Sequence, residues 1–208
     1  MHIFPVSYFP PVPWFAAAQN HSKIILEVHQ HFRKQQYTNR SQIKLSNRIM
    51  PLTVPIQRRG EKAAIKDKKI SYAENWQKQH WYSLESAYRG SPYFEFYQDK
   101  LAQIFEQQFI WLLDLNLAST QLCLEILGLN IELQHSEEYH DSSHYTTDYR
   151  SRFDPSLRKL PSWFQPVPYP QVFEGFSAGL SVIDLICNMG PESRLILQQS
   201  FISDSNKG

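Results

Sequence analysis

Glu27, His29 and His31 occupy alternate positions directly after the apolar run 24–26. If that run is a β-strand, the three side chains share one face, because side chains alternate along a strand. A carboxylate and two imidazoles are costly to bury without partners, so a chain that needed only a core would place Val or Ile there. We interpret the three as candidate catalytic residues. The ordinary alternative is that they pair with neighbouring elements at a half-exposed strand end.

The segment 29–40, which follows this strand, is rich in Asn, Gln, Arg and His. Such side chains hold a polar, hydroxyl-rich or phosphorylated ligand through directional hydrogen bonds. Arg40 and Arg150 are candidate bidentate binders of an anion, although surface exposure is the commoner role of an Arg. A polar loop after a buried strand is where open α/β sheets bind their ligands.

A βαβ unit is predicted to position these residues. Residues 3–8 alternate as a strand does, residues 14–19 form a short helix, and the run from Ile24 is a second strand, parallel to the first. The start of the helix would then face the strand ends, where its free N–H groups suit an anion.

Further strands are predicted after the polar segment. Residues 42–45 and 49–54 should form an antiparallel hairpin, because the Ser-Asn pair between them favours a turn. Residues 70–72 read as a short edge strand, and residues 130–135 alternate as a later strand.

The helices are predicted mainly in a helical segment, 75–128. Apolar side chains recur at helical spacing in 76–89, in a helix that starts near Tyr93, and in 119–127. His80 lies on the apolar face of the first of these, where packing is the usual role of a histidine. Ser181 should cap a last long helix, 182–189, with a further helical turn or two in 192–199.

A long polar loop, 136–168, separates the two helical regions and contains Asp148 and Arg150. Loops of this length in a compact domain are usually functional or mobile. The pattern as a whole predicts one α/β domain over residues 1–208, with a mostly parallel sheet opened by the βαβ unit, an antiparallel hairpin and flanking helices.

Composition excludes several classes of protein. The 21 basic and 20 acidic residues nearly balance, so no basic field indicates nucleic acid. With 7 glycines the chain has neither of the glycine-rich phosphate-binding motifs, and it has no nucleophile-elbow motif. No apolar run is long enough to span a bilayer, so we expect a cytoplasmic protein without membrane insertion.

Metal chemistry is also weakly indicated. The two cysteines, Cys123 and Cys187, lie in apolar helical patterns and read as small core residues. Glu27, His29 and His31 would need a further ligand from elsewhere to hold zinc, and the zinc-protease motif is absent. We therefore expect no metal site.

The sequence resembles the WbqC-like family of bacterial proteins over most of its length. The resemblance rests on the order and spacing of short motifs, each of them weak alone. The motifs are Tyr8–Phe15, Glu27–Phe32, Lys34–Arg40, Leu52–Pro55, Trp76–Trp81, Ser86–Tyr88, Ser91-Pro92, Thr147–Arg150, Gln171–Glu174, Leu180–Leu185 and Gly190–Glu192.

Members of this family occur in gene clusters that build O-antigen and other surface polysaccharides. The resemblance implies a cytoplasmic transferase that attaches glycine or a related acyl group to a nucleotide-linked amino sugar. Its partner would be a small-molecule nucleotide-sugar or acyl donor. The cofactor is left unspecified, and self-association into a homo-oligomer is left open.

The resemblance assigns no catalytic residues, so the site is inferred from the matching motifs. His29 or His31 would accept the proton of the attacking amine, oriented by Glu27 or Asp148. The oxyanion or a phosphate would be held by Asn39, Arg40 or the N–H groups after Pro13. The candidate substrate-binding residues are Tyr8, Pro10, Gln35, Asn39, Arg40, His80, Asp148, Arg150 and Gln171.

Two alternatives stay open. Gln30 stands where the family pattern favours an acid, and Pro170 stands where a polar or aromatic residue is usual. The missing acid, with aromatic-rich surface loops expected at Trp163-Phe164 and Tyr169, would suit a non-catalytic binding or assembly subunit of the polysaccharide machinery. A metal-dependent hydrolase is the weaker alternative.

Overall fold

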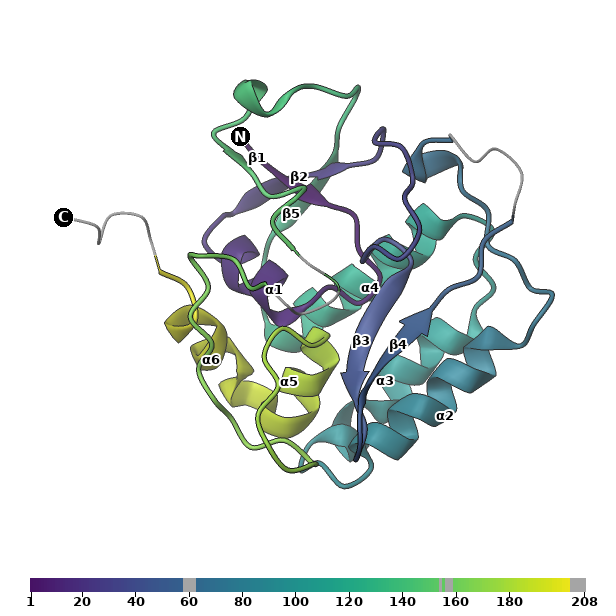
Figure 1. Cartoon of the computed structure of the whole chain (residues 1–208), viewed down its shortest axis with the longest axis vertical. Helices are drawn as coiled ribbons and strands as arrows, with labels where there is room; N and C mark the ends of the chain where they lie inside the picture. Colours follow the sequence, from purple (N-terminus) through teal and green to yellow (C-terminus); the bar gives the residue numbers. More distant parts are fainter. Residues whose placement is uncertain (58–62, 154, 156–158, 203–208) are drawn as a thin grey trace.

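The structure is a computed structural model, and it describes residues 1–57, 63–153, 155 and 159–202. The fold contains a parallel four-stranded sheet in the order β5-β2-β1-β6. Figure 1 shows this sheet at one end of the molecule, with most of the helices gathered at the other. The strands are β1 (His2–Pro5), β2 (Lys23–Glu27), β5 (Glu132–His135) and β6 (Thr147–Asp148).

The predicted βαβ unit is confirmed. Strand β1 pairs in parallel with β2, Ile3 opposite Ile25, and helix α1 (Val12–Ala18) connects them. Every residue of α1 is buried, because the helix is apolar all round and its run of three alanines leaves room for close neighbours. Its first turn anchors to the strand, since Trp14 Nε1 donates to the Pro5 carbonyl at 3.2 Å.

The prediction that the start of α1 binds an anion is wrong. The Val12 N–H donates to the Leu180 carbonyl at 2.8 Å, and the Trp14 N–H donates to the Pro11 carbonyl at 2.9 Å. Pro13 has no N–H to offer. The donors that a ligand would need are therefore already used within the protein.

The predicted hairpin is also confirmed, as β3 (Arg40–Lys44) and β4 (Ile49–Thr53) pair antiparallel. The predicted edge strand at 70–72 does not form. Ile70 makes only an isolated bridge to Ile56, because the neighbouring segments meet there at single residues rather than along a register.

Five helices follow α1 in the described part of the chain, and Figure 1 labels each of them. Asn75 caps the first through its side chain, as predicted, and Ser181 caps α5. Helix α4 begins at Leu112 rather than Ser119 and ends at Gly128, whose φ of 63° favours glycine. The helices are α2 (Trp76–Tyr88), α3 (Phe94–Glu106), α4 (Leu112–Leu127), α5 (Val182–Met189) and α6 (Ser193–Gln199).

The polar loop predicted at 136–168 contains the fourth strand, which the sequence pattern did not reveal. Strand β6 pairs with the start of β1, His2 opposite Thr147. The chain thus places β2 on one side of β1 and β6 on the other, so the strand order reverses at β1. Open α/β sheets bind ligands at such a switch point, beyond the carboxyl ends of the strands.

The core is continuous from the sheet to the helices. Cys123 and Cys187 are both unpaired and fully buried in it, which confirms their interpretation as core residues. Across the part of the chain that the structure describes, no helix has the length and apolar character needed to cross a bilayer.

Candidate functional site

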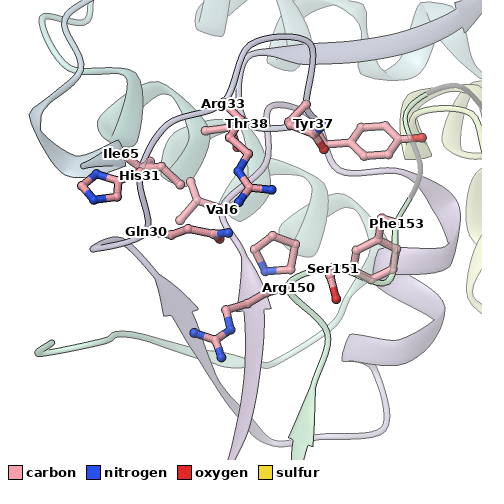
Figure 2. Close-up of a pocket in the computed structure, with 12 residues that line it drawn as sticks. Val6, Gln30, His31, Arg33, Tyr37, Thr38, Ile65, Arg150, Ser151 and Phe153 are labelled. Atoms are coloured by element: carbon pink, nitrogen blue, oxygen red, sulfur yellow. The ribbon is translucent and has the colours of Figure 1, made fainter. Parts of the chain in front are cut away.

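A pocket of about 180 Å³ opens at the carboxyl edge of the sheet, where the strand order reverses. Pro5, the last residue of β1, forms part of its wall. The rest of the wall comes from the segments that follow β1, β2 and β6, which include residues 33–38, and from Ile65. Figure 2 shows the lining side chains converging from these segments. The position is the one predicted for a ligand site after β2.

Glu27 ends β2, is fully buried and bonds two lining residues of the pocket, Gln30 and Arg150. Its Oε1 accepts from the backbone N–H groups of His29 (2.8 Å) and Gln30 (3.2 Å) and from the hydroxyl of Ser136 (3.0 Å). These bonds turn the chain at Glu27, so the strand stops and the predicted alternation of Glu27, His29 and His31 on one strand face is wrong. The carboxylate shapes the loop that lines the pocket.

Arg150 is the ionic partner of Glu27. Its Nη1 lies 3.0 Å from Glu27 Oε2, and its Nη2 lies 2.6 Å from Asp148 Oδ2. The same guanidinium lies over the rings of Tyr139 and Tyr145, at 4.9 and 5.4 Å from their centroids. A fully buried carboxylate is thereby paired with a cation that is itself held on several sides.

The Asp148 carboxyl is ionised by this arrangement. Partial burial acts to raise its pKa, but the hydrogen bonds from the side chain and backbone of Arg150, together with the charge of Arg150, outweigh burial and lower the pKa below its usual value. The contacts of Arg150 with Glu27 and Asp148 fix the end of β6 against the end of β2.

The structure separates the two candidate histidines. His31 lines the pocket and is exposed, whereas His29 is partly buried and does not line it. In Figure 2 the His31 ring lies at the rim, on the opposite side from Ser151 and Phe153. Among the described residues, neither imidazole has a hydrogen-bond partner that would orient it.

Tyr8, Pro10 and His80 are buried in the core, outside the pocket lining. The Tyr8 hydroxyl and His80 Nδ1 lie 3.1 Å apart, and Trp76 packs edge-on against the imidazole. Burial lowers the pKa of His80 to about 4, so the ring is neutral near pH 7. The helical spacing of residues 76–89 predicted a packed role for His80, and its burial agrees with that prediction.

Asn39, Arg40 and Gln35 also lie outside the lining. Asn39 Nδ2 donates to the Val54 carbonyl at 3.0 Å, and Arg40 Nε donates to Thr53 Oγ1 at 3.3 Å, so both side chains support the β3–β4 hairpin. Gln35 is exposed at a turn where its φ is 62°.

Gln171 belongs to a second buried polar cluster. Its Nε2 donates to Asp184 Oδ1 at 2.8 Å, and the Tyr169 hydroxyl donates to the same oxygen at 2.8 Å. Lys44 Nζ donates to the carbonyls of Phe173 (3.0 Å), Glu174 (2.8 Å) and Gly175. This cluster fixes the segment before α5 and lies outside the pocket lining.

The cluster gives a testable pH dependence. Burial raises the pKa of Asp184 to about 6 from its usual 3.8, although the hydrogen bonds from Tyr169 and Gln171 act to lower it. Between these values the folded chain holds a proton that the unfolded chain releases, so stability falls as pH rises, by up to about 3 kcal/mol.

We expect Asp184→Asn to remove this dependence, with the exposed Asp99→Asn as the matched control. Urea unfolding between pH 4 and pH 7 measures it. If the Asp184→Asn variant and the native chain lose stability in parallel over that range, the role of Asp184 is refuted.

Among the described residues, no group of three or more His, Cys, Asp or Glu side chains is arranged to hold a metal ion. The stacked pair His140 and His144, with ring centroids 3.9 Å apart, therefore finds no third zinc ligand within the part of the chain that the structure describes. The reading as a metal-dependent hydrolase gains no support from these residues.

Comparison with known proteins finds a family match over the part of the chain that contains the pocket. The sequence profile of the WbqC-like protein family matches residues 6–155. The chain belongs to the WbqC-like protein family. This WbqC-like region contains every lining residue of the pocket except Pro5, whereas α5 and α6 lie outside it.

One curated relative of this WbqC-like chain is the uncharacterised protein Rv1507c of Mycobacterium tuberculosis. It is 27% identical over 190 residues, which cover 78% of this chain and 81% of the relative. No solved structure matches this WbqC-like chain. The comparisons therefore establish the family and leave the reaction to be argued from the site.

Sequence reasoning did not single out several lining residues of this WbqC-like pocket. Arg33, Gln36 and Thr38 lie in the polar segment 29–40 that was predicted to hold a ligand, so their composition was the available signal. Ser151 and Phe153 follow β6, and no pattern marks that two-residue strand.

Proposed function

We propose that this WbqC-like protein is a transferase of surface-polysaccharide biosynthesis, which attaches glycine or a related acyl group to a nucleotide-linked amino sugar. The observation that carries the proposal is the pocket at the switch point of a parallel sheet, lined by polar side chains and one exposed imidazole. Gln30, Thr38 and Ser151 supply neutral donors and acceptors of the kind that sugar hydroxyl groups need.

The chemistry requires one proton acceptor beside the sugar amine. The amine nitrogen attacks the carbonyl carbon of an activated acyl donor, the C–N bond forms, and the donor's leaving group departs with its electron pair. The amine must lose a proton in this process, and His31 is the imidazole at the pocket that could take it. We assign this role to His31 rather than His29, because His29 does not line the pocket.

The test is product formation by the purified full chain. UDP- and dTDP-linked amino sugars with a free amine are incubated with activated glycine and with acyl-thioester donors. The masses of the products are then measured by mass spectrometry. We expect one sugar nucleotide to gain the mass of one acyl residue. The matched N-acetylated sugar nucleotide, whose amine is blocked, should gain none. Binding of a free-amine sugar nucleotide without product from any donor would contradict catalysis.

A second candidate is a non-catalytic binding or assembly subunit of the polysaccharide machinery. It is favoured by the lack of an orienting partner for either imidazole among the described residues. The aromatic residues that suggested a surface for assembly do not support it, since Trp163, Phe164 and Tyr169 are each at most 8% exposed. Co-purification with a glycosyltransferase, with no product in the assay above, would favour this candidate.

A further inference from the structure

Arg150 has little capacity left to bind a ligand. A guanidinium carries five N–H donors. Within the described residues, Nε donates to Asp148, Nη1 donates to Glu27 and to the His140 carbonyl, and Nη2 donates once to Asp148, so four of the five are used. In Figure 2 the guanidinium points away from Arg33. Arg150 therefore has a structural role, which is to join the ends of β2 and β6.

Arg33 has the opposite character. It lines the same pocket and is exposed, and within the described ranges 1–57, 63–153 and 159–202 it has no hydrogen bond or ion pair. Figure 2 shows its guanidinium and the amide of Gln30 entering the same space beside Val6. Its donors face the pocket without an acceptor from these residues.

The carboxylates of the site cannot take up that charge. Glu27 is fully buried and its two oxygens accept from four groups, while both oxygens of Asp148 accept from Arg150. These hydrogen bonds leave both carboxylates little capacity to pair with Arg33 as well. An anionic ligand in the pocket would therefore pair with Arg33, whose donors are not engaged by these carboxylates.

We propose that Arg33, with the amide of Gln30, binds a phosphate of the nucleotide-linked ligand. This inference rests on the proposed function, because it names the part of that substrate which the pocket receives. The pocket is small, about 180 Å³ against roughly 300–1,000 Å³ for sites that enclose a whole ligand, so it takes one group of a larger molecule. Five guanidinium donors with the amides of Gln30 and Gln36 suit the four non-bridging oxygens of a sugar-nucleotide diphosphate better than the two oxygens of a carboxylate.

The experiment measures binding by titration calorimetry on the full chain, with UDP, inorganic pyrophosphate, uridine and glycine as separate probes. Arg33→Gln should weaken the binding of UDP and of pyrophosphate about ten- to hundredfold, the range expected for losing hydrogen bonds to a charged group. The affinity of Arg33→Lys for both probes should lie between those of the native chain and Arg33→Gln, because Lys keeps the positive charge but loses the planar, paired N–H donors of the guanidinium. Arg48→Gln is the matched control, since Arg48 is exposed like Arg33 and lies outside the pocket.

The remaining readouts separate this inference from the proposed reaction. Rising NaCl should weaken UDP binding to the native chain and affect Arg33→Gln less. Unchanged UDP binding by Arg33→Gln, equal binding of uridine and UDP, tighter binding of glycine than of pyrophosphate, or no binding of either phosphate probe each overturns the assignment. Phosphate binding lost in Arg33→Gln, without any transfer product from the native chain, would support the phosphate site and count against the reaction alone.

Discussion

Glu27→Ala is expected to lower the free energy of unfolding by about 3–5 kcal/mol, the usual loss when one partner of a buried ion pair is removed. The reason is the number of groups that depend on a single carboxylate. The variant leaves the N–H groups of His29 and Gln30, the Ser136 hydroxyl and one N–H of Arg150 without their acceptor, at a position that is fully buried. Urea unfolding at pH 7 measures the loss.

Two controls define the source of this effect. Glu27→Gln keeps one acceptor oxygen and the side-chain shape, so it should cost less than Glu27→Ala. Glu132→Gln removes a carboxylate from the exposed Lys23–Glu132 pair, whose atoms are 3.7 Å apart, and should change stability by about 1 kcal/mol or less. Equal losses in Glu27→Ala and Glu132→Gln would show that the buried network does not stabilise the fold.

His31→Ala is expected to lower kcat for acyl transfer by about 10²–10⁴-fold, the usual contribution of a general base. The melting temperature should change little, because the His31 side chain is exposed and has no partner among the described residues. The acidic limb of the pH–rate profile, which reports protonation of the base, should disappear. Added imidazole should restore part of the rate, a result that a purely structural role would not give.

His29→Ala is the matched control for this prediction. It removes the same side chain two residues away, from a position that does not line the pocket. The kcat of this variant should stay near that of the native chain. Equal losses in both variants, or full activity in His31→Ala, would remove His31 from the proposed mechanism.

Local patterns account for the parts of the fold that could be predicted. The βαβ unit and the β3–β4 hairpin follow from alternation and turn residues within short stretches. The Asn75 and Ser181 caps follow from single side chains beside the helices that they begin. Each of these features depends on residues close together in the sequence.

The unpredicted parts depend on distant partners. Strand β6 has only two residues, too few for any periodicity, and it exists because β1 offers an edge. Glu27 was singled out as a costly residue, but its partner Arg150 lies 123 positions away. The alternation that suggested a shared face for Glu27 and the histidines could not reveal that Glu27 bonds the next two backbone N–H groups and ends the strand.

The pairing of His2 with Thr147 has a consequence for how the protein is made. Contacts between such remote positions form late and slowly, since a long stretch of chain must first be ordered between them. During synthesis β1 and β2 emerge long before Arg150, so a nascent chain carries the Glu27 carboxylate without its counter-ion. Ligand-binding competence should consequently arise late, once the chain through Phe153 has left the ribosome.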